Sequence, residues 1–164
     1  GNSANGIDFP SLDVDMKVTS VRQPQSSCPF RSARQKIYGL GYSLIIFVYD
    51  KVDDESTHTG MLRITDTIFV EAERTADFQI TKRILEVLEE DGNDDDLHAL
   101  LSERNLPIDE IGIGRLVEEI KRLPPIQGYL TISNALQWRL QYGRVIDKAG
   151  QVAGVTALHH VERS

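Results

Sequence analysis

An alternating run near the start of the chain constrains its fold most. Between residues 12 and 19, apolar and polar side chains alternate strictly, which is the period-2 pattern of a half-buried β-strand. Because side chains on a strand return to the same face every second residue, Asp13, Asp15 and Lys17 share one face. We expect the apolar residues of this strand to face the core and the three charged residues to lie on the opposite side.

Asp8 precedes this strand, and the intervening Phe9-Pro10-Ser11 predicts a tight connection that folds it back beside Asp15. Two carboxylates next to Lys17 supply the parts of a metal-dependent phosphodiesterase. Mg²⁺ takes carboxylate, water and phosphate oxygens as ligands, and it polarises phosphate and activates a bound water. A neighbouring lysine orients that water or neutralises developing charge. On the motif alone, a solvated charged strand face remains the simpler interpretation.

A stretch without acidic residues follows this motif. No Asp or Glu lies between Asp15 and Asp50, although the whole chain has 25 acidic and 18 basic residues. Basic, amide and hydroxyl side chains suit contacts with phosphates and base edges. We therefore predict a DNA-binding surface here, and a solvated basic loop is the alternative. The candidate DNA-binding residues are Arg22, Gln23, Gln25, Ser26, Ser27, Arg31, Arg34 and Gln35.

Asp8, six intervening residues and Asp15-Met16-Lys17 resemble the PD-(D/E)xK nuclease signature. The short spacing is similar to that of the MutH-like type II restriction endonucleases, with Asp15 where Glu is more usual. The resemblance implies that Asp8 and Asp15 bind the metal and that Lys17 positions or activates water. It matches Lys36 to a further lysine that stabilises phosphate charge. It also implies an acidic and a basic residue upstream of Asp8, so either these lie on a segment outside this chain or the site is incomplete.

Periodicity predicts the order of the remaining elements. A helix begins after Thr75-Ala76-Asp77, and the other elements are expected as strands at 43–51, 61–71 and 128–133, helices at 95–104 and 109–123, a helical turn at 134–142 and a hairpin at 143–152. This order predicts an α/β fold, with a mixed central β-sheet flanked by helices, and by resemblance a restriction-endonuclease-like one. We expect residues 1–125 to form the nuclease core. Residues 126–164 are expected to pack on the core or to contribute to DNA recognition.

Basic, amide and aromatic side chains are concentrated in this C-terminal segment, which is compatible with DNA contact. They are Gln137, Trp138, Arg139, Gln141, Tyr142 and Arg144. Trp138 and Tyr142 are spaced as neighbours on one side of a helix. We therefore expect these two to face the core, and a role of the segment in recognition is the second interpretation.

Composition limits the classes of function. The longest apolar run, 44–49, is too short to span a membrane, and the N-terminus lacks the pattern of a signal peptide. The single cysteine, Cys28, excludes an internal disulfide and fits a reducing cytoplasm, so we expect a cytoplasmic protein without a membrane partner. The net charge of -7 opposes DNA binding, but many of the acids lie within 86–96. Salt screens such remote charge over about 10 Å.

The sequence therefore predicts a type II restriction endonuclease that hydrolyses double-stranded DNA with Mg²⁺, or with Mn²⁺ in its place. The enzyme is expected to act as a monomer or a homodimer. Two alternatives stay open: an inactive nuclease-like module that binds DNA, and a protein-interaction domain that does not contact DNA. The net negative charge is the feature that favours the last of these.

Overall fold

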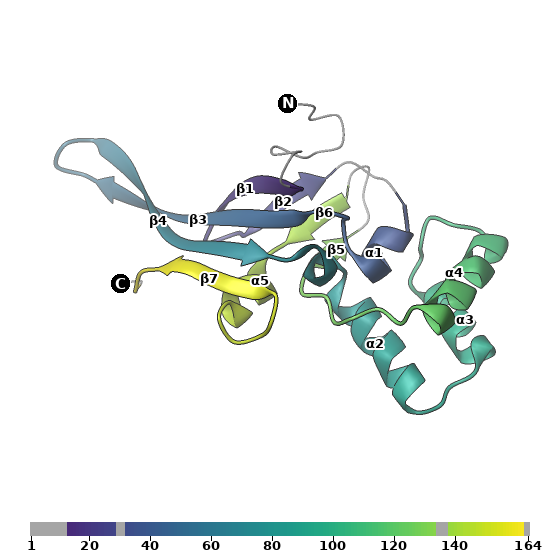
Figure 1. The fold of residues 1–164 in the computed structure, drawn as a ribbon. Helices are drawn as coiled ribbons and strands as arrows, with labels where there is room; N and C mark the ends of the chain where they lie inside the picture. Colours follow the sequence, from purple (N-terminus) through teal and green to yellow (C-terminus); the bar gives the residue numbers. More distant parts are fainter. Residues whose placement is uncertain (1–12, 29–31, 134–137, 163–164) are drawn as a thin grey trace.

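The computed structural model describes residues 13–28, 32–133 and 138–162. Its strands form two sheets, with the orders β1-β3-β4-β7 and β2-β6-β5, and helices flank them (Figure 1). The strands are β1 Val14–Ser20, β2 Gln25–Cys28, β3 Ser43–Asp54, β4 Thr59–Val70, β5 Thr131–Ser133, β6 Trp138–Gln141 and β7 Val155–His160. The helices are α1 Arg34–Tyr38, α2 Phe78–Glu89, α3 Asp94–Glu103, α4 Glu110–Arg122 and α5 Gly143–Lys148, and a 3₁₀ turn spans Ala72–Thr75.

The larger sheet is mixed. β1 runs parallel to β3, and α1 lies in the connection between them. β3 and β4 form an antiparallel hairpin whose far end extends beyond the other strands (Figure 1). β7 then pairs antiparallel with β4 at the other edge. The predicted α/β fold with a mixed central sheet is therefore confirmed.

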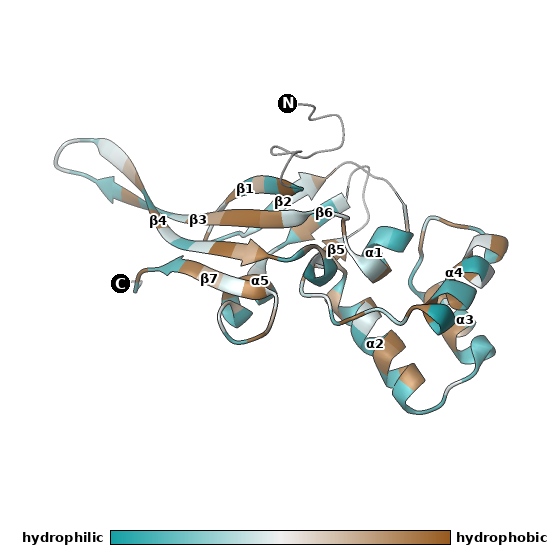
Figure 2. Cartoon of the chain, in the orientation of Figure 1, coloured by the Kyte–Doolittle hydropathy of each residue, from teal (hydrophilic) through white to brown (hydrophobic). Residues whose placement is uncertain are grey.

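The main core fills the space between the two sheets. Leu44, Ile46 and Val48 of β3 are fully buried, and Ile132 and Leu140 face them from the smaller sheet within the same cluster. Figure 2 shows the hydrophobic colouring along the central part of β3. Burial of this apolar surface is the main force that holds the sheets together. β1 is attached to this core through its pairing with β3.

A second core lies among α1, α2, α3 and α4. Side-chain caps begin three of these helices: Asp77 accepts a hydrogen bond from Ile80 N, Asn93 from Asp96 N and Asp109 from Gly112 N. The predicted helices at these positions are confirmed, and α4 ends before Pro124 as expected. None of the helices in the described ranges combines the length and hydropathy of a membrane span.

The start of α3 offers a direct test of helix capping. Asn93 forms a reciprocal capping box with Asp96, so we expect Asn93→Ala to lower the free energy of unfolding by about 1 kcal/mol. Chemical denaturation followed by circular dichroism measures this change. Asp95→Ala is the matched control, because Asp95 is exposed in the same turn and makes no cap. Equal losses in the two variants would contradict the capping role.

The burial of β1 reverses one expectation. Asp15 and Thr19 are only 2% and 3% exposed, whereas Met16 and Val18 are 41% and 56% exposed. The prediction that the apolar side of this strand faces the core is therefore wrong. Pairing aligns Asp15 with Leu44 and Thr19 with Val48, and aligned residues share a face, so the polar side of β1 turns toward the smaller sheet. Alternation shows that a strand has two faces, but pairing decides which one is buried.

Two further elements differ from the prediction. The expected helical turn at 134–142 is wrong, because residues 138–141 form β6 between β2 and β5. The expected hairpin at 143–152 is also wrong, because α5 occupies its first half. Short segments of this kind follow their tertiary partners more than their own propensity. The segment from residue 126 onward contributes strands to both sheets, with the division at 125 remaining a prediction.

Candidate active site

Asp15 and Lys17 lie together on β1. The ammonium nitrogen of Lys17 is 2.9 Å from Oδ2 of Asp15, with 18% of the Lys17 side chain and 3% of the Asp15 side chain exposed. The two residues meet because positions i and i+2 of a strand share a face. A buried carboxylate with a partly exposed cation beside it forms a polar site at the edge of the sheet. Asp8, the other predicted metal ligand, lies outside the described residues.

Tyr142 lies close enough to Asp15 to feel its negative charge. Burial raises the pKa of the Tyr142 hydroxyl well above its usual value, and the negative charge of Asp15 acts in the same direction. Ser26 on β2 hydrogen-bonds the same hydroxyl. The phenol therefore stays neutral at physiological pH and contributes a hydrogen-bonding group, not a charge, beside Asp15.

Lys36 occupies a different environment. It is only 3% exposed, and its ammonium lies 5.3 Å from the centroid of the Trp138 ring. Burial lowers the pKa of Lys36, while the nearby Asp77 acts in the opposite direction. The backbone N–H of Asp77 also donates to the Lys36 carbonyl, which ties α1 to the start of α2. Lys36 is thus a buried cation held over an aromatic ring.

The predicted DNA-binding residues separate into two groups. Gln25, Ser26 and Ser27 lie on β2, after exposed Arg22 and Gln23. The second group lies on α1 and makes structural contacts there. Arg34 donates to Glu119 of α4 at 2.7 Å, and Gln35 donates to the Leu40 carbonyl at 3.0 Å. The Glu119 carboxylate also raises the pKa of Arg34. Arg31 falls outside the described residues.

The structure places two residues of the C-terminal segment beside the predicted DNA-binding residues of β2. β2 pairs antiparallel with β6, which brings Arg139 opposite Ser27 and Gln141 opposite Gln25. Trp138 and Leu140 are buried, whereas Arg139 and Gln141 are exposed. This alternation is the sequence signal that indicates a strand with a polar outer face. It was missed because the helical spacing of Trp138 and Tyr142 favoured a helical turn.

Of the two predicted metal ligands, only Asp15 lies within the described residues. Within the described ranges, no three His, Cys, Asp or Glu side chains are grouped as a metal site requires.

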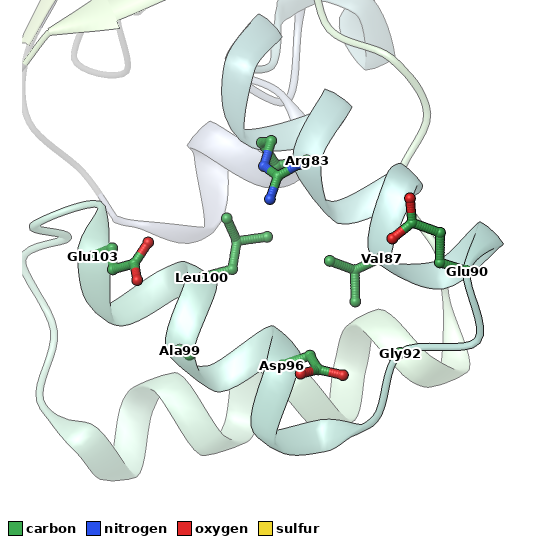
Figure 3. A pocket seen from close by; sticks show the side chains of 8 residues that line it. All are labelled: Arg83, Val87, Glu90, Gly92, Asp96, Ala99, Leu100 and Glu103. Atoms are coloured by element: carbon green, nitrogen blue, oxygen red, sulfur yellow. The ribbon is translucent and has the colours of Figure 1, made fainter.

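A surface hollow of about 360 Å³ lies between α2 and α3, away from Asp15 and Lys17 on β1 (Figure 3). Its lining includes the carboxylates of Glu90, Asp96 and Glu103 against one guanidinium, Arg83. Carboxylates repel phosphates, so this hollow does not suit a nucleic-acid ligand.

A mixed sheet with an Asp-x-Lys strand beside a parallel neighbour is the arrangement of a restriction-endonuclease-like protein. The family model described as type II restriction enzyme NspV matches residues 1–157. The type II restriction enzyme NspV of Nostoc sp. is 65% identical over 159 residues, which cover 97% of this chain and 72% of that relative. The chain therefore belongs to the NspV family of type II restriction enzymes. No solved structure gave a significant match.

This membership confirms the predicted restriction endonuclease and the predicted resemblance to PD-(D/E)xK nucleases. The chain is thus a DNA endonuclease, a hydrolase of phosphodiester bonds. It also favours the enzyme over the two alternatives that the sequence left open, the inactive DNA-binding module and the protein-interaction domain.

Proposed function

We propose that this chain hydrolyses double-stranded DNA in a Mg²⁺-dependent reaction at Asp15 and Lys17. The observation that carries the proposal is the buried Asp15 carboxylate, held 2.9 Å from the Lys17 ammonium on one strand face. The carboxylate suits a hard divalent ion, because Mg²⁺ requires oxygen ligands and negative charge, and the ammonium beside it lies where it can act on water and phosphate. Asp15 and Asp8 would hold the ion, with the Met16 carbonyl as a further ligand.

Mg²⁺, when bound, supplies a Lewis acid that polarises the phosphate and lowers the pKa of water. Residues of this chain orient the water and stabilise the developing charge. Lys17 orients the attacking water by hydrogen bonding and offsets the negative charge that develops on the phosphate oxygens. Asp15 holds the Lys17 ammonium in place, which limits the motion of that long side chain. By family resemblance, the products carry a 5′-phosphate and a 3′-hydroxyl.

Lys36 is proposed to stabilise phosphate charge from a second side. Its burial and its position over the Trp138 ring hold the ammonium in one orientation. A desolvated cation interacts more strongly with an anion than an exposed one does, because water screens it less. Lys36 would therefore act on the phosphate through its charge, while Lys17 acts on the water.

Removal of the metal tests this proposal. We expect the chain to cut phage and plasmid DNA into discrete fragments with Mg²⁺, to lose all cleavage with excess EDTA, and to regain it when Mg²⁺ or Mn²⁺ is restored. Agarose gels of timed digests measure the result. Ca²⁺ is the control cation, since its larger size and looser geometry support binding without matching the Mg²⁺ coordination. Fragmentation that continues in EDTA would refute a metal-dependent mechanism.

A further inference from the structure

The smaller sheet presents a polar outer face. Its three strands are antiparallel, and residues directly opposite each other on such strands share a face. The pairing produces two rows of outward side chains: Gln25, Gln141 and Thr131 in one, Ser27, Arg139 and Ser133 in the other. All six are exposed or half-exposed. The alternate positions Leu140 and Ile132 are buried in the core between the sheets.

The chemistry of this outer face is that of base recognition. Its six side chains are amides, hydroxyls and one guanidinium, and none is a carboxylate, although the chain as a whole has a net charge of -7. Arginine makes paired hydrogen bonds to guanine, and glutamine makes them to adenine, in the major groove. Antiparallel strands are also narrow enough to enter that groove. The face therefore combines a suitable shape with suitable hydrogen-bonding groups.

A basic pocket adjoins this face at the β5 edge. The Arg144 guanidinium donates to the Thr131 hydroxyl at 2.7 Å and lies 4.2 Å from the centroid of the Phe78 ring. The pocket has a volume of about 330 Å³, and Lys82, Arg83, Arg104 and Glu86 also line it. Arg83 and Glu86 form an ion pair at 2.7 Å. Within the described residues, Lys82, Arg104 and Arg144 have no carboxylate partner.

Among the described residues, the only carboxylate that lines the pocket, Glu86, is paired with Arg83. Lys82, Arg104 and Arg144 therefore repel one another, and an anion bound among them is stabilised. The aromatic ring of the pocket is already engaged, because Arg144 and Lys82 lie near Phe78 and Tyr129 packs against it with centroids 6.0 Å apart. The pocket therefore offers positive charge more than an open surface for base stacking. A backbone phosphate is the anion that fits both this charge and the adjoining polar face.

We propose that the outer face of β2, β6 and β5 reads base edges in duplex DNA, with Arg139 and Gln141 determining specificity and the basic pocket anchoring a phosphate. The inference rests on the proposed action on double-stranded DNA, and it adds the residues that select the sequence. The face also lies close enough to Asp15 for one DNA duplex to contact both. Gln25 N donates to the Thr19 hydroxyl at 2.9 Å. Thr19 follows Asp15 by four residues, about 13 Å along a strand, or roughly four base pairs of DNA.

Selection of bound duplexes from a randomised pool, in EDTA and without divalent metal, tests the reading face. We expect the wild type to enrich one sequence, and Arg139→Ala or Gln141→Ala to lose the preference at one position by about tenfold. Arg115→Ala removes an exposed arginine from α4 and is expected to keep the wild-type preference. Wild-type selection that both variants retain unchanged would overturn the proposal, as would a wild type that enriches no sequence.

The pocket is tested by salt dependence of binding to the enriched duplex and to an unrelated duplex. Lys82 is exposed, so Lys82→Ala is expected to fold normally. We expect it to weaken both complexes by a similar factor and to lower the dependence on salt by about one phosphate contact. Salt dependence equal to that of Arg115→Ala would remove the pocket from the proposal. Cleavage of the enriched duplex with Mg²⁺ is measured separately. A protein that selects a DNA sequence but does not cut it would contradict the proposed cleavage function and leave the proposed reading face intact.

Discussion

Asp15→Asn is expected to slow DNA cleavage strongly while the protein still binds DNA. Asparagine has the shape of aspartate but no charge, so the variant loses a metal ligand and the anionic partner of Lys17. We expect the single-turnover cleavage rate to fall by about 10²–10³-fold. Quenched time courses on a plasmid substrate with Mg²⁺ measure this rate. DNA affinity without metal should be equal or higher, because one negative charge near the phosphate is gone.

Asp13→Asn is the matched control for this substitution. Asp13 is an exposed carboxylate immediately before β1, and alternation alone predicted it on the same face as Asp15. We expect Asp13→Asn to cleave at the wild-type rate, and Lys17→Ala to resemble Asp15→Asn. A thermal melt of each variant separates loss of catalysis from loss of folding. If Asp15→Asn cut DNA as fast as Asp13→Asn, the assignment of the active site to β1 would be wrong.

Trp138→Ala is expected to cause the largest loss of stability. The Trp138 side chain is 1% exposed and belongs to the core between the two sheets. Truncation of a buried tryptophan leaves a large cavity, which costs about 3–5 kcal/mol. The Lys36 ammonium would also lose the ring over which it lies. Urea denaturation followed by circular dichroism measures the change in the free energy of unfolding.

The neighbouring residue provides the control for Trp138. Arg139 lies on the same strand with its side chain exposed, so Arg139→Ala should change the free energy of unfolding by less than about 0.5 kcal/mol. The two variants therefore separate stability from DNA selection within one strand: Trp138→Ala loses stability, and Arg139→Ala loses sequence preference. A Trp138→Ala protein as stable as Arg139→Ala would show that β6 does not belong to the core.

The helices and longer strands were predictable because their determinants are local. Three helices begin at side-chain caps that accept a hydrogen bond from the backbone N–H three residues further on: Asp77, Asn93 and Asp109. Capping residues of this kind can be recognised in a sequence. The shared face of Asp15 and Lys17 also follows from the two-residue period of a single strand. These features explain why the nuclease resemblance and the α/β fold were accessible without a structure.

Other features depend on contacts between distant segments. The buried side of β1 is set by its register with β3, and the identity of residues 138–141 as a strand is set by β2 and β5 on either side. Likewise, Lys36 meets Trp138 only after both segments have folded onto the core. A period in the sequence is the same whichever face is buried, so these outcomes required tertiary information.

The sequence by itself determined the class of enzyme, the carboxylate and lysine of the candidate site, and the order of the main elements. The tertiary structure decided which side of β1 is buried, and it joined Gln25 and Ser27 with Gln141 and Arg139 into one polar face. The physical reason is the range of the interactions. Helix caps and strand alternation act over a few residues, whereas sheet pairing joins residues more than a hundred positions apart, whose contacts no local pattern encodes.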